Sequence, residues 1–340
     1  VVTGVFLEPR SRIRKRALYS NIRIHLHYDE SIDGTSKENS KFIKEDLLPG
    51  AQQFWSTALL VKPSAASVRL YRKCASRAYY ARRYEKHRHC VKACASKTKC
   101  GEVVVPDDHL YQCRFCRDAD AATCARSGPV DGRGVPFADF VLYVSAVDSP
   151  RCRGKDTVAY AAHCQQEKSL DRPIAGHVNL CPKAISTQQR DREILYSTVK
   201  HEILHAFGFS AGLYAFFRDE NGDPLTPRNE QGKPEKLNKD KGYYQWSPKT
   251  AHVVTRKNWW TIKGPVEHDV HMIVTKRVRE EAQKHFNCSI LEGAELENQG
   301  QEGTMLTHWE KRVFENEAMT GTHTQNPVYS RLTLALMEDT

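Results

Sequence analysis

The sequence predicts an α+β fold in which one long helix lies beneath a mixed, twisted sheet. Three observations support this prediction. Apolar and polar residues alternate over 21–28, a strongly apolar run covers 137–147, and apolar residues recur at helical spacing over 39–61 and 186–208. Periods of two and of 3.6 residues are typical of strands and helices respectively. Because both patterns are interspersed along 340 residues, we expect the sheet and its helices to form packed layers.

The first expected element is a half-buried strand over 21–28, NIRIHLHY. Its apolar face consists of Ile22, Ile24, Leu26 and Tyr28, and its polar face of Arg23, His25 and His27. Two histidines on one face of a strand can ligate a metal ion, but such a pair more often faces solvent. We therefore interpret His25 and His27 as the solvent face of this strand.

A helix is expected next, over 39–61, with an interruption at Pro49–Gly50. Proline inside a helix removes a hydrogen bond and kinks or splits the helix. Further along, FADFVLYVSAV (137–147) and the IAGHVNL stretch before Cys181 predict two apolar strands.

Eleven cysteines are present, and all but Cys288 lie between residues 74 and 181. We expect disulfides formed in an oxidising compartment, with one cysteine left unmatched. An alternative is a structural zinc site built from Cys90-x3-Cys94 and Cys113-x2-Cys116, which would suit a nucleic-acid binder in a reducing compartment. The triplet Asn287-Cys288-Ser289 fits a glycosylation acceptor.

The formal charge of +10 is unevenly distributed, since ten lysines or arginines lie between residues 71 and 100. We interpret this segment as a solvated insertion pinned by disulfides; the alternative is a patch for sulfated glycans, anionic lipid or nucleic acid. The basic run RSRIRKR (10–16) is interpreted as the charged entry to a strand, or alternatively as a processing site after Arg16. The sequence contains no run of about 18 apolar residues, so no transmembrane helix is predicted. No signal-peptide pattern follows Val1. A secreted protein would therefore be present here in processed form.

The helix expected over 186–208 carries the strongest functional signal. Ser186 is predicted as its N-cap with Gln189 completing a capping box, and Gly208 as its end in the left-handed conformation. A spacing of four residues places His201 and His205 on one helical face, where they can bind one metal ion. Glu202 lies beside them and can reach a water molecule on that ion. His-Glu-x-x-His on a well-formed helix is a specific signal for a zinc peptidase.

A catalytic zinc site normally has three protein ligands, so a third is required. Glu220 lies at a plausible distance in the sequence, but its segment 218–242 is charged, rich in glycine and proline, and without helical period. The other candidate is His308, which Met319 follows eleven residues later. A third histidine followed by a methionine turn is the metzincin pattern. We therefore expect His201, His205 and His308 as zinc ligands and Met319 as a buried residue below them.

Two further groups of residues are assigned to structure. His268 and His271, spaced for one turn of a helix, lack a third partner nearby. The aromatic clusters 243–246 (YYQW) and 258–260 (NWW) are expected in the core of a small second subdomain, with a substrate-binding wall as the alternative.

The segments HEILHAFGFS, THWEKRVFENEAMTG and PVYSRLTLALMEDT together resemble the leishmanolysin family of zinc metallopeptidases, its animal branch most closely. CGEVVVPDDH, FADFVLYVSAV and IAGHVNLCP are also similar to family segments. The resemblance implies a metzincin-type fold with an inserted subdomain between the second and third zinc ligands. It implies zinc bound by His201, His205 and His308, catalysis by Glu202, and structural roles for Gly208 and Met319. The long basic stretch over 71–100 departs from the family pattern.

The expected function is therefore a metalloendopeptidase with one Zn²⁺ per chain, in which zinc activates water and Glu202 acts as general base. The alternative is a disulfide-rich adhesion or polyanion-binding protein with a vestigial zinc site. Expected domains are 1–210, ending with the helix, and 211–340, with a cysteine-rich domain beyond; the resemblance also implies a zymogen. Expected partners are protein or peptide substrates, with anionic glycans or a lipid surface at 71–100, and no nucleic acid. The expected location is the secretory pathway, outside the cell or at its surface, with an intracellular pool as alternative.

Overall fold

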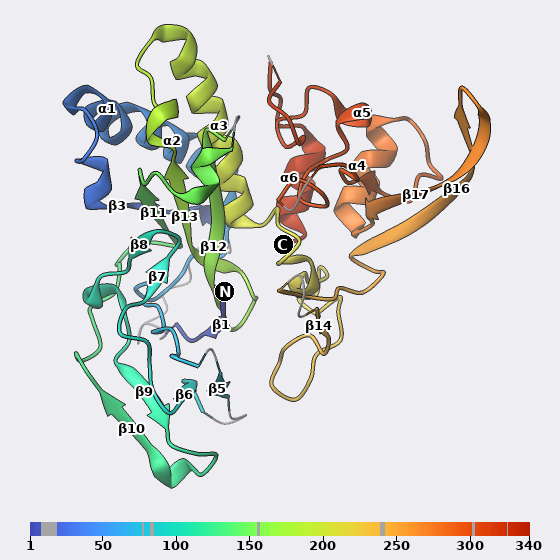
Figure 1. Cartoon of the computed structure of the whole chain (residues 1–340). Coiled ribbons are helices and arrows are strands. Elements are labelled where there is room, and N and C mark those ends of the chain that lie inside the picture. The colour runs from blue at the N-terminus through green and yellow to red at the C-terminus, as the bar shows by residue number, and fades with distance from the viewer. Residues whose placement is uncertain are drawn as a thin grey trace. The chain divides into compact units, whose positions relative to one another are not determined.

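The computed structural model describes residues 1–7, 19–76, 78–81, 85–154, 157–238, 242–300, 303–324 and 326–340. The basic run 10–16 lies outside the described residues. The chain divides into two compact units, Val1–Phe207 and Gly208–Thr340, and each is described by itself (Figure 1).

The first unit contains α1 (Lys37–Phe42), α2 (Leu48–Ala58), α3 (Gln189–Phe207), β1 (Val2–Val5), β2 (Ser20–Asn21), β3 (Ile24–Tyr28), β4 (Leu60–Val61), β5 (Tyr79–Tyr80), β6 (His89–Val91), β7 (Lys99–Cys100), β8 (Val103–Val104), β9 (Cys113–Cys116), β10 (Cys124–Ser127), β11 (Phe140–Ser145), β12 (Ala159–Glu167) and β13 (Pro173–Leu180). The second unit contains β14 (Leu237–Asn238), β15 (Tyr243–Tyr244), β16 (Ala251–Thr261), β17 (Gly264–Ile273), α4 (Lys276–His285), β18 (Ala294–Glu295), α5 (Lys311–Phe314) and α6 (Arg331–Glu338). None of the described helices combines the length and the apolar character needed to cross a bilayer.

The main sheet of the first unit has the strand order β1-β12-β13-β11-β3. Only β12 and β13 run antiparallel; the other three pairs are parallel, so the sheet is mixed, as predicted. The strands expected at 21–28, 137–147 and 174–180 are confirmed as β3, β11 and β13. Strands β11 and β13 are buried along their whole length, which their continuous apolar sequences reflect.

The helix predicted over 39–61 is interrupted before Pro49 by an irregular turn, but it is not split. Helix α1 passes through a π-helical stretch, Ile43–Leu47, into α2, which has Pro49 in its first turn. The chain remains helical there, and the Leu48 N–H bonds to the Ile43 carbonyl; the irregular stretch directly precedes Pro49, which has no N–H to donate. The helix ends earlier than predicted, at Ala58, because Leu59 adopts an extended conformation that leads into β4.

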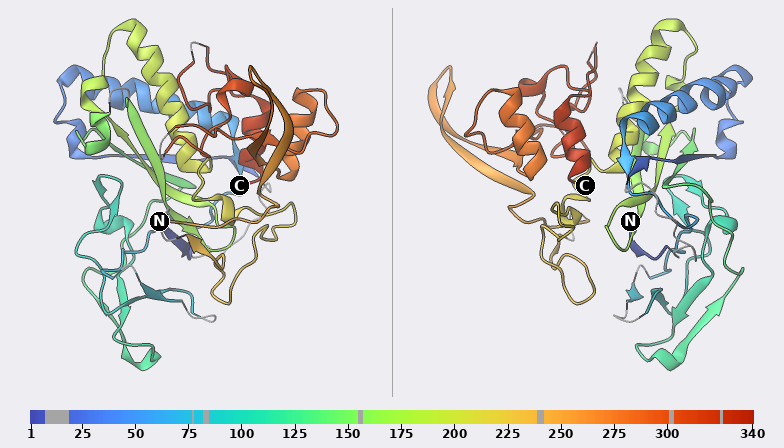
Figure 2. Two further views of the ribbon diagram at one scale, coloured as in Figure 1. Left: turned by 45° about the vertical axis from the view of Figure 1, so that its right-hand side comes forward. Right: turned by 180° about the vertical axis from the view of Figure 1, so that it is seen from behind.

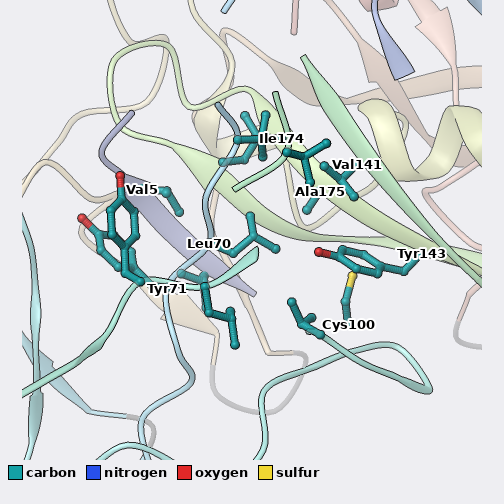
Figure 3. Close-up of a cluster of buried hydrophobic side chains, with 14 of the residues drawn as sticks. Val5, Leu70, Tyr71, Cys100, Val141, Tyr143, Ile174 and Ala175 are labelled. Carbon is teal, nitrogen blue, oxygen red and sulfur yellow. The ribbon is translucent and has the colours of Figure 1, made fainter. Parts of the chain in front are cut away.

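One face of the sheet packs against a hydrophobic core to which residues between Val68 and Val135 contribute (Figure 3). Tyr143 of β11 and Ile174 of β13 are fully buried there, next to Leu70 and Tyr111 of the connecting segment. The residues that flank the basic stretch 71–100 therefore belong to the core of the first unit.

Ten of the eleven cysteines form disulfides, which confirms that prediction. The pairs are Cys74–Cys90, Cys94–Cys113, Cys100–Cys164, Cys116–Cys124 and Cys152–Cys181. The structural zinc site considered for this segment is wrong, because all four of its cysteines are oxidised. Cys288 is the free cysteine.

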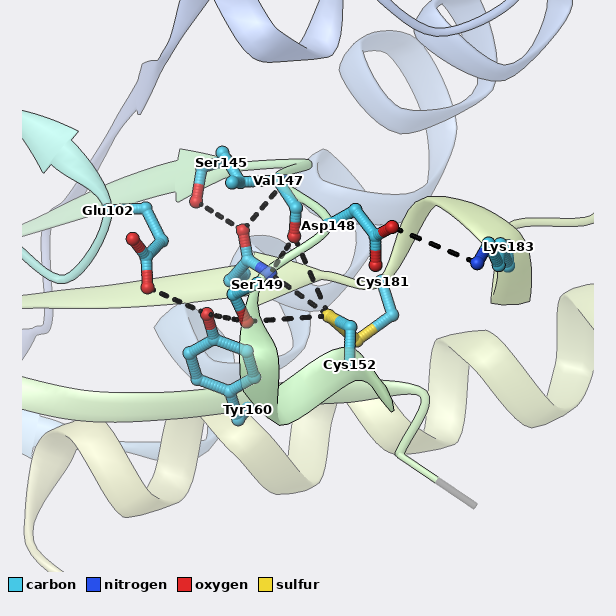
Figure 4. The surroundings of a disulfide bond; sticks show 10 residues. Glu102, Ser145, Val147, Asp148, Ser149, Cys152, Tyr160, Cys181 and Lys183 are labelled. Carbon is cyan, nitrogen blue, oxygen red and sulfur yellow. Dashed lines mark hydrogen bonds and ion pairs between the residues drawn. A yellow bond between two sulfur atoms is a disulfide. The ribbon is translucent and has the colours of Figure 1, made fainter. Parts of the chain in front are cut away.

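The Cys152–Cys181 disulfide fixes the chain between β13 and α3 (Figure 4). Beside it, the Asn179 side chain accepts hydrogen bonds from the Ser145 hydroxyl at 2.7 Å and from the Val147 N–H at 2.9 Å. The Tyr160 hydroxyl lies 2.8 Å from the Ser149 hydroxyl. The end of β13 and the approach to α3 are thus held by both covalent and polar contacts.

A long hairpin, β16–β17, is the most extended element of the second unit (Figures 1 and 2). The prediction that the 258–260 cluster belongs to a core is wrong, since Trp260 is 77% exposed.

The 243–246 cluster is half-buried: Tyr243 stacks on Trp246, whose ring contacts the buried Tyr214. His268 and His271 lie on β17, not on a helical turn, so a spacing of three directs them to opposite faces.

Two turns of the same construction follow one another at 218–224 and 228–234. In the first, Asp219 Oδ1 accepts hydrogen bonds from the N–H groups two and four residues later, both at 2.9 Å. In the second, Asn229 Oδ1 accepts the equivalent two at 3.0 and 3.1 Å. Each turn contains a glycine with positive φ, Gly222 and Gly232. The chain therefore carries a ten-residue repeat that the sequence analysis did not identify.

Candidate metal centre

Helix α3 begins and ends differently from the prediction. It begins at Gln189, so Ser186 is not its N-cap, and the predicted capping box is wrong. The Ser186 hydroxyl instead donates to Asp191 at 2.7 Å and accepts from the Gln188 N–H at 3.3 Å. The helix ends at Phe207, but Gly208 does not have positive φ. A Cβ on Gly208 would lie 2.6 Å from a methyl group of Thr340, so close packing favours glycine there.

The position of α3 on the sheet is fixed by tight contacts. A Cβ on Gly176 of β13 would lie 2.8 Å from the Ala206 methyl group, so the helix and the strand approach as closely as glycine allows. From the other side, the buried Trp55 of α2 donates its indole N–H to the Lys200 carbonyl at 3.0 Å. The Phe207 ring packs edge-on against Phe140 at 4.8 Å between centroids. These contacts hold the helix in one register against the sheet.

His201 and His205 come together on one face of α3. Their Nε2 atoms lie 3.0 Å apart, and their ring centroids are separated by 4.7 Å. Two imidazole nitrogens that each lie about 2.0–2.1 Å from one tetrahedral zinc ion are separated by about 3.3 Å. Both rings are half-buried. The pair therefore fits two ligands of a single metal ion.

Glu202 lies between these histidines in sequence and faces the sheet. Its carboxylate accepts a hydrogen bond from the Ala161 N–H of β12, and burial raises its pKa to about 8. A divalent cation nearby would favour the charged form and lower this pKa. The Ala161 contact was not predicted, because a main-chain donor leaves no signal in the sequence.

His308 is buried in the second unit, and its environment determines its tautomer. Its Nδ1 lies 3.0 Å from the Thr304 carbonyl oxygen, which can only accept, so Nδ1 carries the proton. The lone pair of the ring is then on Nε2. Metal-binding histidines commonly donate their other ring N–H to a carbonyl or carboxylate in this way.

Met319 is fully buried and adjacent to the His308 segment in the same unit. Its carbonyl accepts the Trp309 N–H at 2.8 Å, and Trp309 donates its indole N–H to Thr333 at 2.9 Å. The Thr333 hydroxyl in turn contacts the buried Glu317. This network fixes the backbone of His308 relative to Met319.

The competing third ligand, Glu220, is engaged elsewhere in the second unit. It is exposed in the first of the two repeated turns, and its carboxylate lies 2.6 Å from Lys276 Nζ. This ion pair and the exposed position disfavour Glu220 as a ligand.

Two arginines in the described part of the basic segment 71–100 make contacts within the fold. Arg72 is buried and paired with Asp107 at 2.8 Å. The Arg88 guanidinium packs over the Tyr79 and Tyr71 rings, at 4.4 and 5.2 Å from their centroids. The side chains of Arg72 and Arg88 therefore contact other residues of the first unit.

Comparison with known proteins places these features in a family. A family model described as leishmanolysin matches residues 125–340. The chain is 58% identical over 322 residues to the leishmanolysin-like peptidase of Caenorhabditis elegans, covering 95% of this chain and 48% of the relative. For the leishmanolysin-like peptidase of Drosophila melanogaster the identity is 53% over 333 residues, or 97% and 48% of the two chains. The mouse ciliated left-right organizer metallopeptidase is 31% identical over 213 residues, 62% of this chain and 26% of the relative. The chain spans about half the length of the leishmanolysin-like peptidases that it matches.

Proposed function

The chain belongs to the leishmanolysin family, and from this premise we propose that it is the catalytic part of a zinc-dependent endopeptidase. The observation that carries the proposal is the 3.0 Å approach of His201 Nε2 and His205 Nε2 beside Glu202. Relatives that share more than half of its residues carry the name peptidase.

The proposed zinc ligands are His201, His205 and His308. The approach of the first two supports a shared ion, and the Nδ1–H tautomer of His308 supports coordination through Nε2. Three neutral imidazoles leave the charge of the ion uncompensated, as in catalytic zinc sites. Met319 is proposed as the hydrophobic residue below the ion, which its burial supports.

When bound, zinc would supply a Lewis acid that polarises the scissile carbonyl and acidifies water. The Glu202 carboxylate is proposed to take the proton from that water and to deliver it to the amine nitrogen of the leaving peptide. Its hydrogen bond from the Ala161 N–H orients the carboxylate without involving another titratable group.

The edge of β12 beside α3 is proposed to bind the substrate main chain. From Ala159 to His163 this strand pairs with β13, and within the described ranges no strand pairs with its other edge there. An extended peptide can add to such an edge through main-chain hydrogen bonds, which are independent of sequence. We therefore propose an unfolded or extended protein segment as substrate. The five disulfides support a place in the secretory pathway or outside the cell.

Metal analysis after dialysis tests the ligand set. The wild-type chain should retain one equivalent of zinc, and His205→Ala and His308→Ala should bind it much more weakly. His268→Ala is the matched control, because His268 is also half-buried but lies on β17. A His308→Ala chain that retains zinc with wild-type affinity would exclude His308 as a ligand.

Hydrolysis of an unfolded fluorogenic protein tests the activity. The zinc-loaded wild type should cleave it, and the chelator-treated chain should not until zinc is restored. Activity that survives Glu202→Ala would contradict the proposed mechanism, and an inactive zinc-loaded wild type would contradict the function.

A further inference from the structure

The turn of the β16–β17 hairpin exposes an apolar surface that the proposed peptidase site does not use. We define the hairpin tip as residues 257–266, KNWWTIKGPV. Trp260 is 77% exposed and Ile262 fully exposed, and Val266 is also exposed. By contrast, Trp55 and Trp309 are completely buried. Large apolar side chains concentrated at one exposed point indicate an interaction site.

The two neighbouring tryptophans of the tip have different surroundings. Trp259 is half-buried, with its ring 4.6 Å from the His268 ring centroid and 4.6 Å from the Arg312 guanidinium carbon. Successive residues of a strand point to opposite faces, so Trp260 points away from this packing. Trp259 therefore anchors the hairpin within its unit, whereas packing does not account for Trp260.

Hydrogen-bonded pairs close the turn itself, and Ile262 is exposed there. Trp260 is paired with Pro265, and Thr261 with Gly264. The Thr261 hydroxyl donates to the Gly264 carbonyl at 2.8 Å, and Gly264 has a φ of 102°, which favours glycine. Figure 1 shows this end of the hairpin clear of α4 and α6. The tip thus projects from its unit and exposes Trp260 and Ile262.

The charges of the tip are all positive. Lys257 and Lys263 are both exposed, and no acidic residue occurs from 257 to 266; the exposed Glu267 follows the tip directly. The nearest cation outside the tip, Arg256, is already paired with Glu292 at 2.8 Å. A partner that complements the tip therefore combines an apolar medium with negative charge.

We propose that the hairpin tip docks on an anionic lipid bilayer, with Trp260 and Ile262 inserted at the interface. Tryptophan favours the headgroup level of a bilayer, and lysines on either side can bind anionic headgroups while their stems remain in the apolar layer. A fluid lipid layer can surround the projecting Trp260 and Ile262 side chains, whereas a protein partner would need a matching pocket. Interfacial insertion reaches only about 5–10 Å, which the turn can span without a membrane-crossing helix.

Vesicle co-sedimentation of the whole chain tests this proposal. The wild type should bind vesicles of phosphatidylcholine with phosphatidylserine more tightly than vesicles of phosphatidylcholine alone. The double variant Trp260→Ser/Ile262→Ser should bind the anionic vesicles about tenfold more weakly or worse, and Lys257→Glu/Lys263→Glu should remove the preference for anionic lipid. Ile290→Ser is the matched control, because Ile290 is 86% exposed elsewhere in the same unit and should bind as the wild type does.

Three results would overturn the proposal: no binding by the wild type, equal binding by the double variant, or equal loss in Ile290→Ser. Self-association of the wild type that the double variant abolishes would instead identify the tip as an interface between copies. Hydrolysis of a soluble substrate should be unchanged in the double variant, so this test is independent of the proposed peptidase activity. Near-identical circular dichroism spectra of all variants would verify that each is folded.

Discussion

At the scale of the residue, the central feature is a carboxylate placed between two imidazoles on one helix. The spacing of His201 and His205 follows from helical geometry alone, whereas the orientation of Glu202 depends on the Ala161 N–H. A general base must be within reach of the proton that it moves and must be held there. The β12 edge supplies that restraint without a second titratable group.

Replacing Glu202 by glutamine keeps the shape of the side chain but removes its ability to accept a proton. We expect kcat to fall about 10²–10⁴-fold, while the zinc content stays at the wild-type level. Steady-state kinetics combined with metal analysis measures both quantities. A variant that loses its zinc as well would show that Glu202 supports the metal site instead of moving a proton.

A second group of residues should make the first unit sensitive to acid. His27 of β3 faces His109 at 5.2 Å between ring centroids, and His109 Nδ1 lies 2.9 Å from the Tyr143 hydroxyl. Burial, reinforced by His27 and His25, lowers the pKa of His109 to about 4, and Asp108 offsets this only in part. Burial and His25 also lower the pKa of His27, which Asp29 offsets in part. The predicted solvent face of β3 is thus partly covered.

Because the pKa of His109 is depressed in the folded chain, the unfolded chain binds more protons once the pH falls below about 6.5. The contribution of His109 to stability should be fully present above that pH and should decline towards pH 4, lowering the midpoint of thermal unfolding by a few degrees. His109→Gln should reduce this dependence on pH. Equal pH profiles for the wild type and His109→Gln would assign the acid sensitivity to other groups.

At the scale of the element, the contact of α3 with the sheet determines where the candidate site lies. Gly176 and Ala206 face each other where the helix crosses β13. No larger pair fits without separating the two elements, because protein interiors are close-packed. The Cys152–Cys181 disulfide restrains the segment that leads into the helix.

Gly176→Ala would place a methyl group 2.8 Å from the Ala206 methyl group and from the Phe140 ring. We expect the free energy of unfolding to fall by about 1–3 kcal/mol, the usual effect of overpacking. Ala206→Gly combined with this change should restore part of the loss by making room on the helix. Urea denaturation of both single variants and the double variant measures the coupling; strictly additive effects would contradict direct contact.

At the scale of the whole molecule, the covalent cross-links are distributed unevenly. All five disulfides lie in the first unit, and the second contains only the free Cys288. Disulfides stabilise mainly by restricting the unfolded chain. The two units should therefore respond differently to reducing conditions.

Titration of the denatured chain with a thiol reagent should detect one thiol before reduction and eleven after it. Hydrogen exchange of the native chain should show that reductant weakens protection in Val1–Phe207 much more than in Gly208–Thr340. Several thiols before reduction would indicate that the cysteines are not paired as described.

The sequence was most informative where a local period determines the structure. The buried strands β11 and β13 and the helix of His201 and His205 follow from patterns within one element. The disulfide pairing could not be predicted, because it depends on contacts between segments distant in sequence. The same holds for the His308–Thr304 contact, in which a main-chain oxygen sets the tautomer.

Two errors have identifiable causes. The 258–260 cluster was assigned to a core because aromatic residues are usually buried, but in a two-stranded hairpin alternate side chains lack any covering layer. The second error concerns Gly208, which was expected in the left-handed region because glycine commonly ends helices in that conformation. Its φ is not positive, and close packing against Thr340 favours glycine at this position instead.

The repeated turns at 218–224 and 228–234 are two copies of one local structure, spaced ten residues apart. In each turn, one side chain accepts two main-chain N–H groups of that same turn, so the two turns share one local construction. Because Glu220 of the first turn is paired with Lys276, the exposed tip of the second turn, at Glu230 and Gln231, is the better place to insert a short tag or epitope.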